Sequence, residues 1–338
     1  MALVSVVIPT FNRAYCLART LDSVLAQTHA ELEILLVDGG STDETPELVR
    51  RRYGTERRVH YIAQANAGVA AARNHGIRLA RGEFLALLDS DDVWQPWKLE
   101  LQLRCLRQFP ELGMVWTDME AIDPNGRVFN HAYIRSMYST YALFPQDRLF
   151  PQSVPLRSVA PSMEAVVGAA SLGMGMIFLH MIMGNLVDTS TVLIRRGEDF
   201  DFHLRTCRHG PVGFLDLPTI QYQRGMPDRL TRSEYRIHTA TNFLRTITPF
   251  IESARSEIHL PRRMIEGALA DAHEWIGELQ FEANDMAAAR SHLFASIRHR
   301  WWQRRAWELF VCCYLPAVLR GWLRAHRRHL RQRTVASP

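Results

Sequence analysis

Short apolar runs alternate with amphipathic segments over the first hundred residues. The runs at 3–8, 32–37, 59–62 and 84–88 are too short for typical helices and predict strands, the first two of them buried. Apolar residues at helical spacing predict helices over 14–27 and 68–80, and Ser41–Glu44 is a candidate cap for another. Strands that alternate with helices predict a parallel sheet with helices on both faces. Ligands bind at the carboxyl ends of such strands, where polar loops follow at 10–13, 38–43 and 89–92.

The pattern changes beyond residue 96. A helix is expected over 96–109, and a hairpin is expected from 114–117 and 127–129 around the Asp-Pro-Asn-Gly turn at 123–126. The weak periodicity of 131–162 predicts no element. From about residue 236 the pattern is helical, and 269–283 with 286–297 resemble one tetratricopeptide-type helix-turn-helix. We therefore expect three parts: residues 1–110, residues 111–235 and a helical appendage at 236–338.

One uncharged stretch of 23 residues, 165–187, is long enough to span a bilayer. A single crossing would put Asp91 and Asp199 on opposite sides of a membrane. We therefore predict a buried helix here, with a membrane span as the less favoured alternative.

Charge is distributed unevenly along the 338 residues. The net charge is +5, yet residues 298–333 contain ten Arg and one acid, Glu308, so the rest of the chain is acidic. This distribution argues against nucleic acid binding. Five cysteines without a CxxC pair indicate neither a disulfide framework nor a zinc site, and the N-terminus is typical of a strand rather than a signal peptide. The expected location is the cytoplasm.

Three carboxylates follow the strand at 84–88, in the sequence Asp89-Ser90-Asp91-Asp92. Carboxylates this close repel one another unless a positive group joins them, and a divalent cation bridging to a phosphorylated substrate fits that need. The alternative is an acidic surface turn that caps the next helix.

Four motifs occur in order along this region: SVVIPTFNR at 5–13, VDGGSTD at 37–43, NAGVAAARNHG at 66–76 and GEFLALLDSDD at 82–92. Together they resemble the nucleotide-sugar half of family 2 glycosyltransferases, densely over 3–110 and more thinly over 185–232. The resemblance implies an α/β fold, a GT-A-type Rossmann-like sandwich with a mostly parallel central sheet. It also implies an inverting transfer of a sugar from a nucleoside-diphosphate sugar, with a UDP-sugar as the first expectation, to a glycan or lipid-linked acceptor.

The resemblance further implies roles for individual residues. Asp38 would accept hydrogen bonds from the base or ribose, and Gly39 stands where many relatives have a second Asp, which leaves the donor base open. The residues expected to lie against the nucleoside are Pro9, Thr10, Phe11 and Asn12.

The phosphate side of the donor would meet a second group of residues. Arg73, on the helix opened by Asn66, would reach the diphosphate; a surface ion pair is its alternative. Asp89 and Ser90 would contact the ribose or sugar, and Asp91 would ligate Mg²⁺ or Mn²⁺. The cation would neutralise charge on the departing diphosphate.

A general base is expected as well, because a sugar hydroxyl is a poor nucleophile until it loses its proton. Asp199, in Gly197-Glu198-Asp199-Phe200-Asp201, resembles the family's acidic pair, with Glu198 or Asp201 as substitutes. The alternative is a charged helix start. Relatives usually insert about a dozen residues before this pair, whereas here Arg196 is followed directly by Gly197.

Two further hypotheses concern partners and activity. The segment 307–323, rich in Trp, Tyr and Leu beside many Arg, suits an amphipathic helix on an anionic membrane surface, such as the cytoplasmic face of the inner membrane. A packed helix with a solvated basic tail is equally consistent. A Rossmann oxidoreductase is excluded by the lack of glycine after the first strand. A non-catalytic nucleotide-sugar-binding or scaffold protein remains the alternative to an enzyme.

Overall fold

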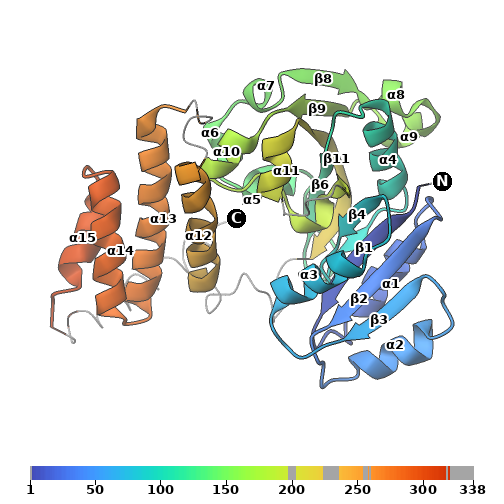
Figure 1. Cartoon of the computed structure of the whole chain (residues 1–338), viewed down its shortest axis with the longest axis horizontal. Helices are drawn as coiled ribbons and strands as arrows, with labels where there is room; N and C mark the ends of the chain where they lie inside the picture. The colour runs from blue at the N-terminus through green and yellow to red at the C-terminus, as the bar shows by residue number, and fades with distance from the viewer. Residues whose placement is uncertain are drawn as a thin grey trace. The chain divides into compact units, whose positions relative to one another are not determined.

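A computed structural model describes residues 2–196, 203–223, 236–253, 258, 260–316 and 319, without the side chains of 203–205. The chain divides into two compact units, Met1–Met226 and Pro227–Pro338. The first unit contains strands and helices, whereas the described part of the second unit is helical (Figure 1).

The first half of the N-terminal unit alternates strands and helices, as predicted. The strands are β1 (Val4–Thr10), β2 (Leu32–Asp38), β3 (Val59–Ala63) and β4 (Phe84–Leu87), and the helices are α1 (Leu17–Leu25), α2 (Thr45–Tyr53) and α3 (Val69–Leu79). β1 pairs in parallel with both β2 and β4, and β2 pairs in parallel with β3. β1, β2 and β4 are fully buried because their side chains are covered on both faces.

The second half adds strands to the same sheet, in the order β3-β2-β1-β4-β10-β6-β11-β9-β8. The added strands are β5 (Val93–Trp94), β6 (Met114–Ile122), β7 (Val128–Asn130), β8 (Gln152–Pro155), β9 (Ser171–Gly175), β10 (Leu193–Arg195) and β11 (Val212–Gln223). β10 is antiparallel to both β4 and β6, so β6 again runs in the direction of β4, and β11 is parallel to β6. Along this order, among the described strands, only β10 and β9 run against the others. The predicted α/β fold with a mostly parallel sheet is confirmed.

Helix α3 lies against the first strands through a glycine. A Cβ atom on Gly76 would lie 2.5 Å from Cγ1 of Val7 in β1 and 3.2 Å from Cγ2 of Val37 in β2. The absence of a side chain therefore lets α3 approach the sheet closely, which places Arg73 near the carboxyl ends of the strands.

The predicted helix at 96–109 and the hairpin at 114–129 are confirmed as α4 (Lys98–Gln108) and as β6 paired with β7. The segment 131–162, for which no element was predicted, contains short pieces. They are α5 (Tyr133–Met137), α6 (Thr140–Leu143), α7 (Gln146–Leu149), β8, α8 (Leu156–Val159) and the 3₁₀ turn η1 (Pro161–Met163).

The prediction of one buried helix over 165–187 is wrong. The stretch contains the end of α9 (Glu164–Val167), then β9, then α10 (Phe178–Met183). Gly168, with φ of 50°, ends α9, and Gly184, with φ of 154°, ends α10, while β9 pairs with β11 and β8. The apolar character reflects burial in the sheet. No described helix has the length and apolar character needed to cross a membrane.

The C-terminal unit is helical, as predicted. Its described helices are α12 (Arg236–Ser253), α13 (Arg262–Glu282), α14 (Met286–His299) and α15 (Arg304–Cys312). The predicted hairpin corresponds to α13 and α14, which meet where Gly277 faces Leu293. One core cluster joins Phe281, Leu293 and Leu309, so α15 packs onto the hairpin.

Candidate active site

Asn12 joins the loops that follow β1 and β2. Its backbone has φ of 55°, in the left-handed region that asparagine tolerates better than most residues. Its Oδ1 accepts hydrogen bonds from the backbone N–H of Thr42 at 2.8 Å and of Asp43 at 3.3 Å, and its own N–H donates to Ser41 Oγ at 2.8 Å. Asp43 Oδ2 in turn accepts from the N–H of Ala14 at 3.1 Å. The two loops are therefore held as one piece.

Asp38, at the end of β2, is fully buried. Its Oδ1 accepts from the N–H and the hydroxyl of Ser41, at 2.8 and 2.7 Å, and its Oδ2 accepts from the Tyr61 hydroxyl at 2.5 Å. Burial, together with this bond to Asp38, raises the pKa of the Tyr61 phenol. Asp38 thus supports the loop, and contact with a base or ribose would require Tyr61 or Ser41 to move aside.

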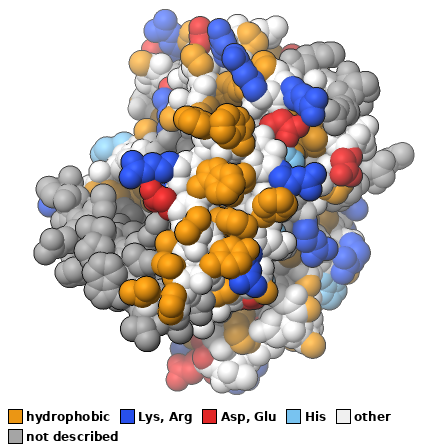
Figure 2. Space-filling view, turned by 90° about the vertical axis from the view of Figure 1, so that its left-hand side faces the viewer, with side chains coloured by type: hydrophobic (Ala, Val, Ile, Leu, Met, Phe, Trp, Pro, Cys, Tyr) orange, Lys and Arg blue, Asp and Glu red, His pale blue; other side chains and the backbone are white. Residues whose placement is uncertain are grey.

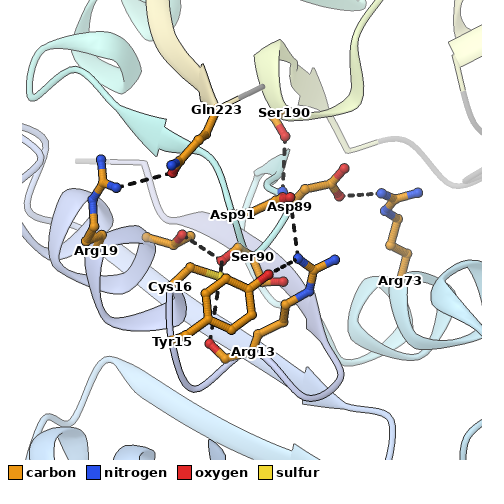
Figure 3. Close-up of polar contacts among 11 residues, drawn as sticks. Arg13, Tyr15, Cys16, Arg19, Arg73, Asp89, Ser90, Asp91, Ser190 and Gln223 are labelled. Carbon is orange, nitrogen blue, oxygen red and sulfur yellow. Dashed lines mark hydrogen bonds and ion pairs between the residues drawn. The ribbon is translucent and has the colours of Figure 1, made fainter. Parts of the chain in front are cut away.

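The acidic loop after β4 meets two arginines from other elements (Figure 3). Arg73 of α3 forms an ion pair with Asp89. Arg13, from the loop after β1, lies 3.6 Å from Asp91, and both side chains of that pair are largely buried. Arg13 Nη1 also donates to the Tyr15 hydroxyl at 2.8 Å. Both arginines therefore direct positive charge at the end of β4.

Two further carboxyl groups lie beside this loop. Asp92 is buried, and its Oδ1 has no hydrogen-bond partner among the described residues. Burial, reinforced by the charges of Asp91, Asp188 and Asp89, raises the pKa of Asp92 well above its usual range. Burial and the charge of Asp89 likewise raise the pKa of Asp188 to about 6. Four carboxyl groups therefore lie close together here, and ionisation of all four at once is unfavourable.

The 3₁₀ turn η2 (Thr189–Thr191), which comes just before β10, holds this acidic region through hydrogen bonds. Ser190 Oγ accepts from the Asp89 N–H at 3.1 Å, and the Ser190 carbonyl accepts from Trp94 Nε1 at 3.0 Å. Asp188 caps the turn by accepting from the Ser190 N–H at 3.0 Å. The position of Asp89 is thus fixed by residues a hundred positions later.

The donor atoms of this region fit a divalent cation of the Mg²⁺ or Mn²⁺ class. Such ions bind through one or two carboxylates, with substrate phosphates and water completing the shell. Asp89 and Asp91 could supply those carboxylates, and beside them lies the buried Asp92 Oδ1, which has no hydrogen-bond partner among the described residues. Within the described part of the chain, no three His, Cys, Asp or Glu side chains converge in a protein-only metal site.

The remaining predicted residues are placed as follows. Phe11 is 44% exposed, whereas Pro9, Thr10 and Gly39 are buried. Asn66 is exposed, and its Oδ1 accepts from the N–H of Gly68 ahead of α3. Ser90 is buried, and its carbonyl accepts from Thr20 Oγ1 at 2.9 Å. Asp199, Glu198 and Asp201 lie outside the described residues.

Sequence reasoning gave no role to Arg13, Tyr61, Asp188 or Ser190. Arg13 belongs to the first of the four motifs, but its position four residues before α1 did not indicate that its partner would be Asp91. Asp188 and Ser190 follow the apolar stretch misassigned as one helix. Only the insertion of β10 between β4 and β6 brings them to the acidic loop.

The chain was compared with protein families and known proteins. A model of glycosyl transferase family 2 matches residues 5–158. The chondroitin synthase of Escherichia coli is 37% identical over 137 residues, which are 40% of this chain and 20% of that protein. An uncharacterized glycosyltransferase of Rickettsia felis is 33% identical over 213 residues, which are 63% of this chain and 31% of that protein. The chain thus spans between a fifth and a third of the length of these relatives.

Among solved structures, residues 1–349 of S. aureus TarS in complex with UDP-GlcNAc align with a TM-score of 0.48 at 14% identity. That alignment covers 93% of this chain and 90% of the TarS chain. The family match spans the loops after β1, β2 and β4 that build the acidic site, together with α3. The part of the chain that is similar to glycosyl transferase family 2 is therefore the part that builds the acidic site.

Proposed function

We propose that the N-terminal unit is an inverting, metal-dependent glycosyltransferase. It would move a sugar from a nucleoside-diphosphate sugar, with UDP-sugars as the first donors to test, to a hydroxyl of a glycan or lipid-linked acceptor on the cytoplasmic side. The observation that carries this proposal is the convergence of Arg13 and Arg73 on Asp91 and Asp89 at the carboxyl ends of parallel strands. This is the edge at which α/β sheets bind their ligands.

The two arginines match the charge of the leaving group. Arg73 pairs with Asp89 through one end of its guanidinium, and the five N–H donors of that group allow a phosphate oxygen to be bound as well. As the bond to the sugar breaks, negative charge grows on the diphosphate, and fixed donors directed at that charge lower the barrier. Arg13 would act from the other side of the acidic loop.

Asp91, with Asp89 beside it, would hold the cation. A bound Mg²⁺ or Mn²⁺ neutralises charge on the diphosphate and orients it. Asp89 also faces Arg73, so its carboxylate would be positioned by that ion pair and by Ser190. The remaining contribution of these residues is geometric, since they fix where the diphosphate lies relative to the sugar.

Asp199 is the general base in this proposal. It would take the proton of the acceptor hydroxyl while the hydroxyl oxygen attacks the anomeric carbon and the diphosphate departs with the bonding electrons. One displacement inverts the configuration at that carbon. This role rests on the resemblance of residues 197–205 to the family's acidic pair.

Release of nucleoside diphosphate from UDP-, GDP- and dTDP-sugars tests the proposal, with Mn²⁺, with Mg²⁺ and with EDTA. We expect turnover that requires metal and falls by about 10²-fold or more in Asp91→Asn. Asp147→Asn, an exposed carboxylate on α7, is the matched control and should retain wild-type turnover. Donor binding without turnover, unchanged in Asp199→Asn, would instead favour the scaffold protein.

A further inference from the structure

Helix α15 is apolar on two sides. Ala306, Leu309 and Cys313 face the core of the C-terminal unit and are buried. Trp307, Val311 and Tyr314 recur at i, i+4 and i+7 and are exposed, Tyr314 at 65%. A helix that packs with one stripe normally has a polar opposite face. The second stripe is therefore not needed for the fold.

The outer stripe is continuous with aromatic residues of α14 and of the connection between the helices. Phe310 lies 6.1 Å from Phe294, 6.2 Å from Trp307 and 5.5 Å from Tyr314, measured between ring centroids. Trp301 and Trp302 are exposed at 68% and 79% and contact each other edge to face. We call this surface the aromatic strip; it consists of Phe294, Trp301, Trp302, Trp307, Phe310, Val311 and Tyr314. Figure 2 shows the side of the molecule on which apolar side chains gather, with charged side chains around them.

The sequence that contains and follows the aromatic strip is rich in arginine. The guanidinium of Arg290 lies over the Tyr314 ring at 5.2 Å, and the exposed side chain of Arg304 forms an ion pair with Glu308 of the same helix. Six further arginines and no acid occur in the sequence at 320–333, outside the described residues. Exposed Trp and Tyr in an arginine-rich sequence suit lipid head groups, since the rings favour the apolar boundary while guanidinium groups meet phosphates.

We propose that the aromatic strip docks the C-terminal unit on an anionic lipid membrane surface. Val311, which is aliphatic, and the exposed Trp301 and Trp302 favour an apolar environment over the stacked bases of a nucleic acid. The positive charge favours anionic over neutral lipid by complementarity. The proposal does not depend on the transferase activity.

Co-sedimentation of the full chain with vesicles tests it. We expect binding to vesicles of phosphatidylcholine mixed with phosphatidylglycerol, weakening as salt is raised, and little binding to phosphatidylcholine alone. The variant Trp302→Ser/Val311→Ser/Tyr314→Ser should bind about tenfold less or weaker still. Arg327→Gln/Arg328→Gln should lose about fivefold for each arginine.

The controls are exposed residues of the N-terminal unit. Leu143→Ser is the apolar control and Arg51→Gln/Arg78→Gln the basic one, and both should bind vesicles as the wild type does. Circular dichroism and thermal unfolding should show that all variants fold, because every substituted apolar side chain is exposed.

Three results would overturn the proposal: equal binding to neutral and anionic vesicles, full binding by the triple variant, or no binding by the wild type. If the wild type does not bind vesicles, sedimentation velocity and a nucleic-acid retention assay show what the aromatic strip binds instead. A wild-type dimer that the triple variant lacks assigns the strip to self-association, and retention on single-stranded nucleic acid assigns it to a polyanion.

Discussion

Arg73 and Asp89 form an ion pair across the end of strand β4, although one belongs to helix α3 and the other to the loop after the strand. The close approach of α3 at Gly76 sets the height of the arginine above the sheet. Ser190 holds the aspartate from the other side. The guanidinium is thus fixed at the sheet edge before any substrate binds.

Removing this guanidinium is expected to impair turnover more than folding. Arg73→Ala should lower kcat/KM for the donor by about 10²-fold, because a fixed donor to the departing diphosphate is lost. Arg73→Lys should recover part of the loss, since it restores the charge without the planar fork. Initial rates of nucleoside diphosphate release measure both effects.

The control is Arg78→Ala, an exposed arginine one turn and a half later on the same helix. It should behave as the wild type. Equal losses in the two variants would mean that the net charge of α3, rather than the position of Arg73, matters.

Asn12 should contribute to stability through both its backbone and its side chain. Asn12→Ala loses the acceptor for Thr42 and Asp43 and puts alanine, which tolerates positive φ less well than asparagine, at this position, so we expect destabilisation by about 2 kcal/mol. Asn12→Gly relieves the backbone and should cost roughly half of that. Urea unfolding followed by circular dichroism separates the two; identical costs would show that φ at this position is unimportant.

The glycine at position 76 should resist substitution. In Gly76→Ala the new Cβ would lie 2.5 Å from Val7 Cγ1, so strand or helix must shift. We expect a loss of about 1–3 kcal/mol in unfolding free energy despite the better helix propensity of alanine.

The matched variant is Gly210→Ala, whose Cβ would meet only a carbonyl oxygen at 3.6 Å. It should be nearly neutral in the same thermal or urea unfolding measurement. A neutral Gly76→Ala would contradict the close contact between α3 and the sheet.

The C-terminal unit should lose stability in mild acid because of His273. Its Nδ1 lies 3.0 Å from His292 Nδ1, its ring stacks on that of His299, and His299 Nδ1 lies 2.7 Å from Glu266. Burial, with the neighbouring histidines acting in the same direction, lowers the pKa of His273 to about 4. Between about pH 6.5 and 4 the unfolded chain therefore binds a proton that the folded chain does not.

Stability should consequently fall as the pH falls through that window, by about 1–2 kcal/mol from this group. Urea unfolding at several pH values measures the slope. His273→Gln should flatten it, whereas the exposed His238→Gln should leave it unchanged. A slope that survives in His273→Gln would assign the effect to other groups.

Much of the first half of the fold could be predicted because three of the four apolar runs there, those of β1, β2 and β4, are strands buried on both faces. Val4–Thr10 and Leu32–Asp38 are continuous strands with no exposed side, so the pattern carries their burial directly. The stretch at 165–187 has the same apolar character, and hydrophobicity alone could not distinguish one long helix from the strand β9 between two short helices that end at Gly168 and Gly184.

The site was predicted unevenly for a related reason. The sequence motifs around Asp89, Asp91 and Arg73 are local, so the charges at these positions could be recognised without knowing the fold. The contact of Asp38 with the ligand stays a prediction. Its hydrogen bond with Tyr61 depends on the register of β2 against β3, which no local sequence pattern indicates. Ser190 reaches Asp89 only through pairing between distant strands.

The fastening of the loops after β1 and β2 through Asn12 has an energetic consequence. A nucleotide that binds there as proposed meets a surface that is already ordered, so little of its affinity is lost in immobilising the chain. Discrimination between donors at this edge would then come from shape and fixed hydrogen-bond directions, because a surface held in one conformation does not adapt to each nucleotide.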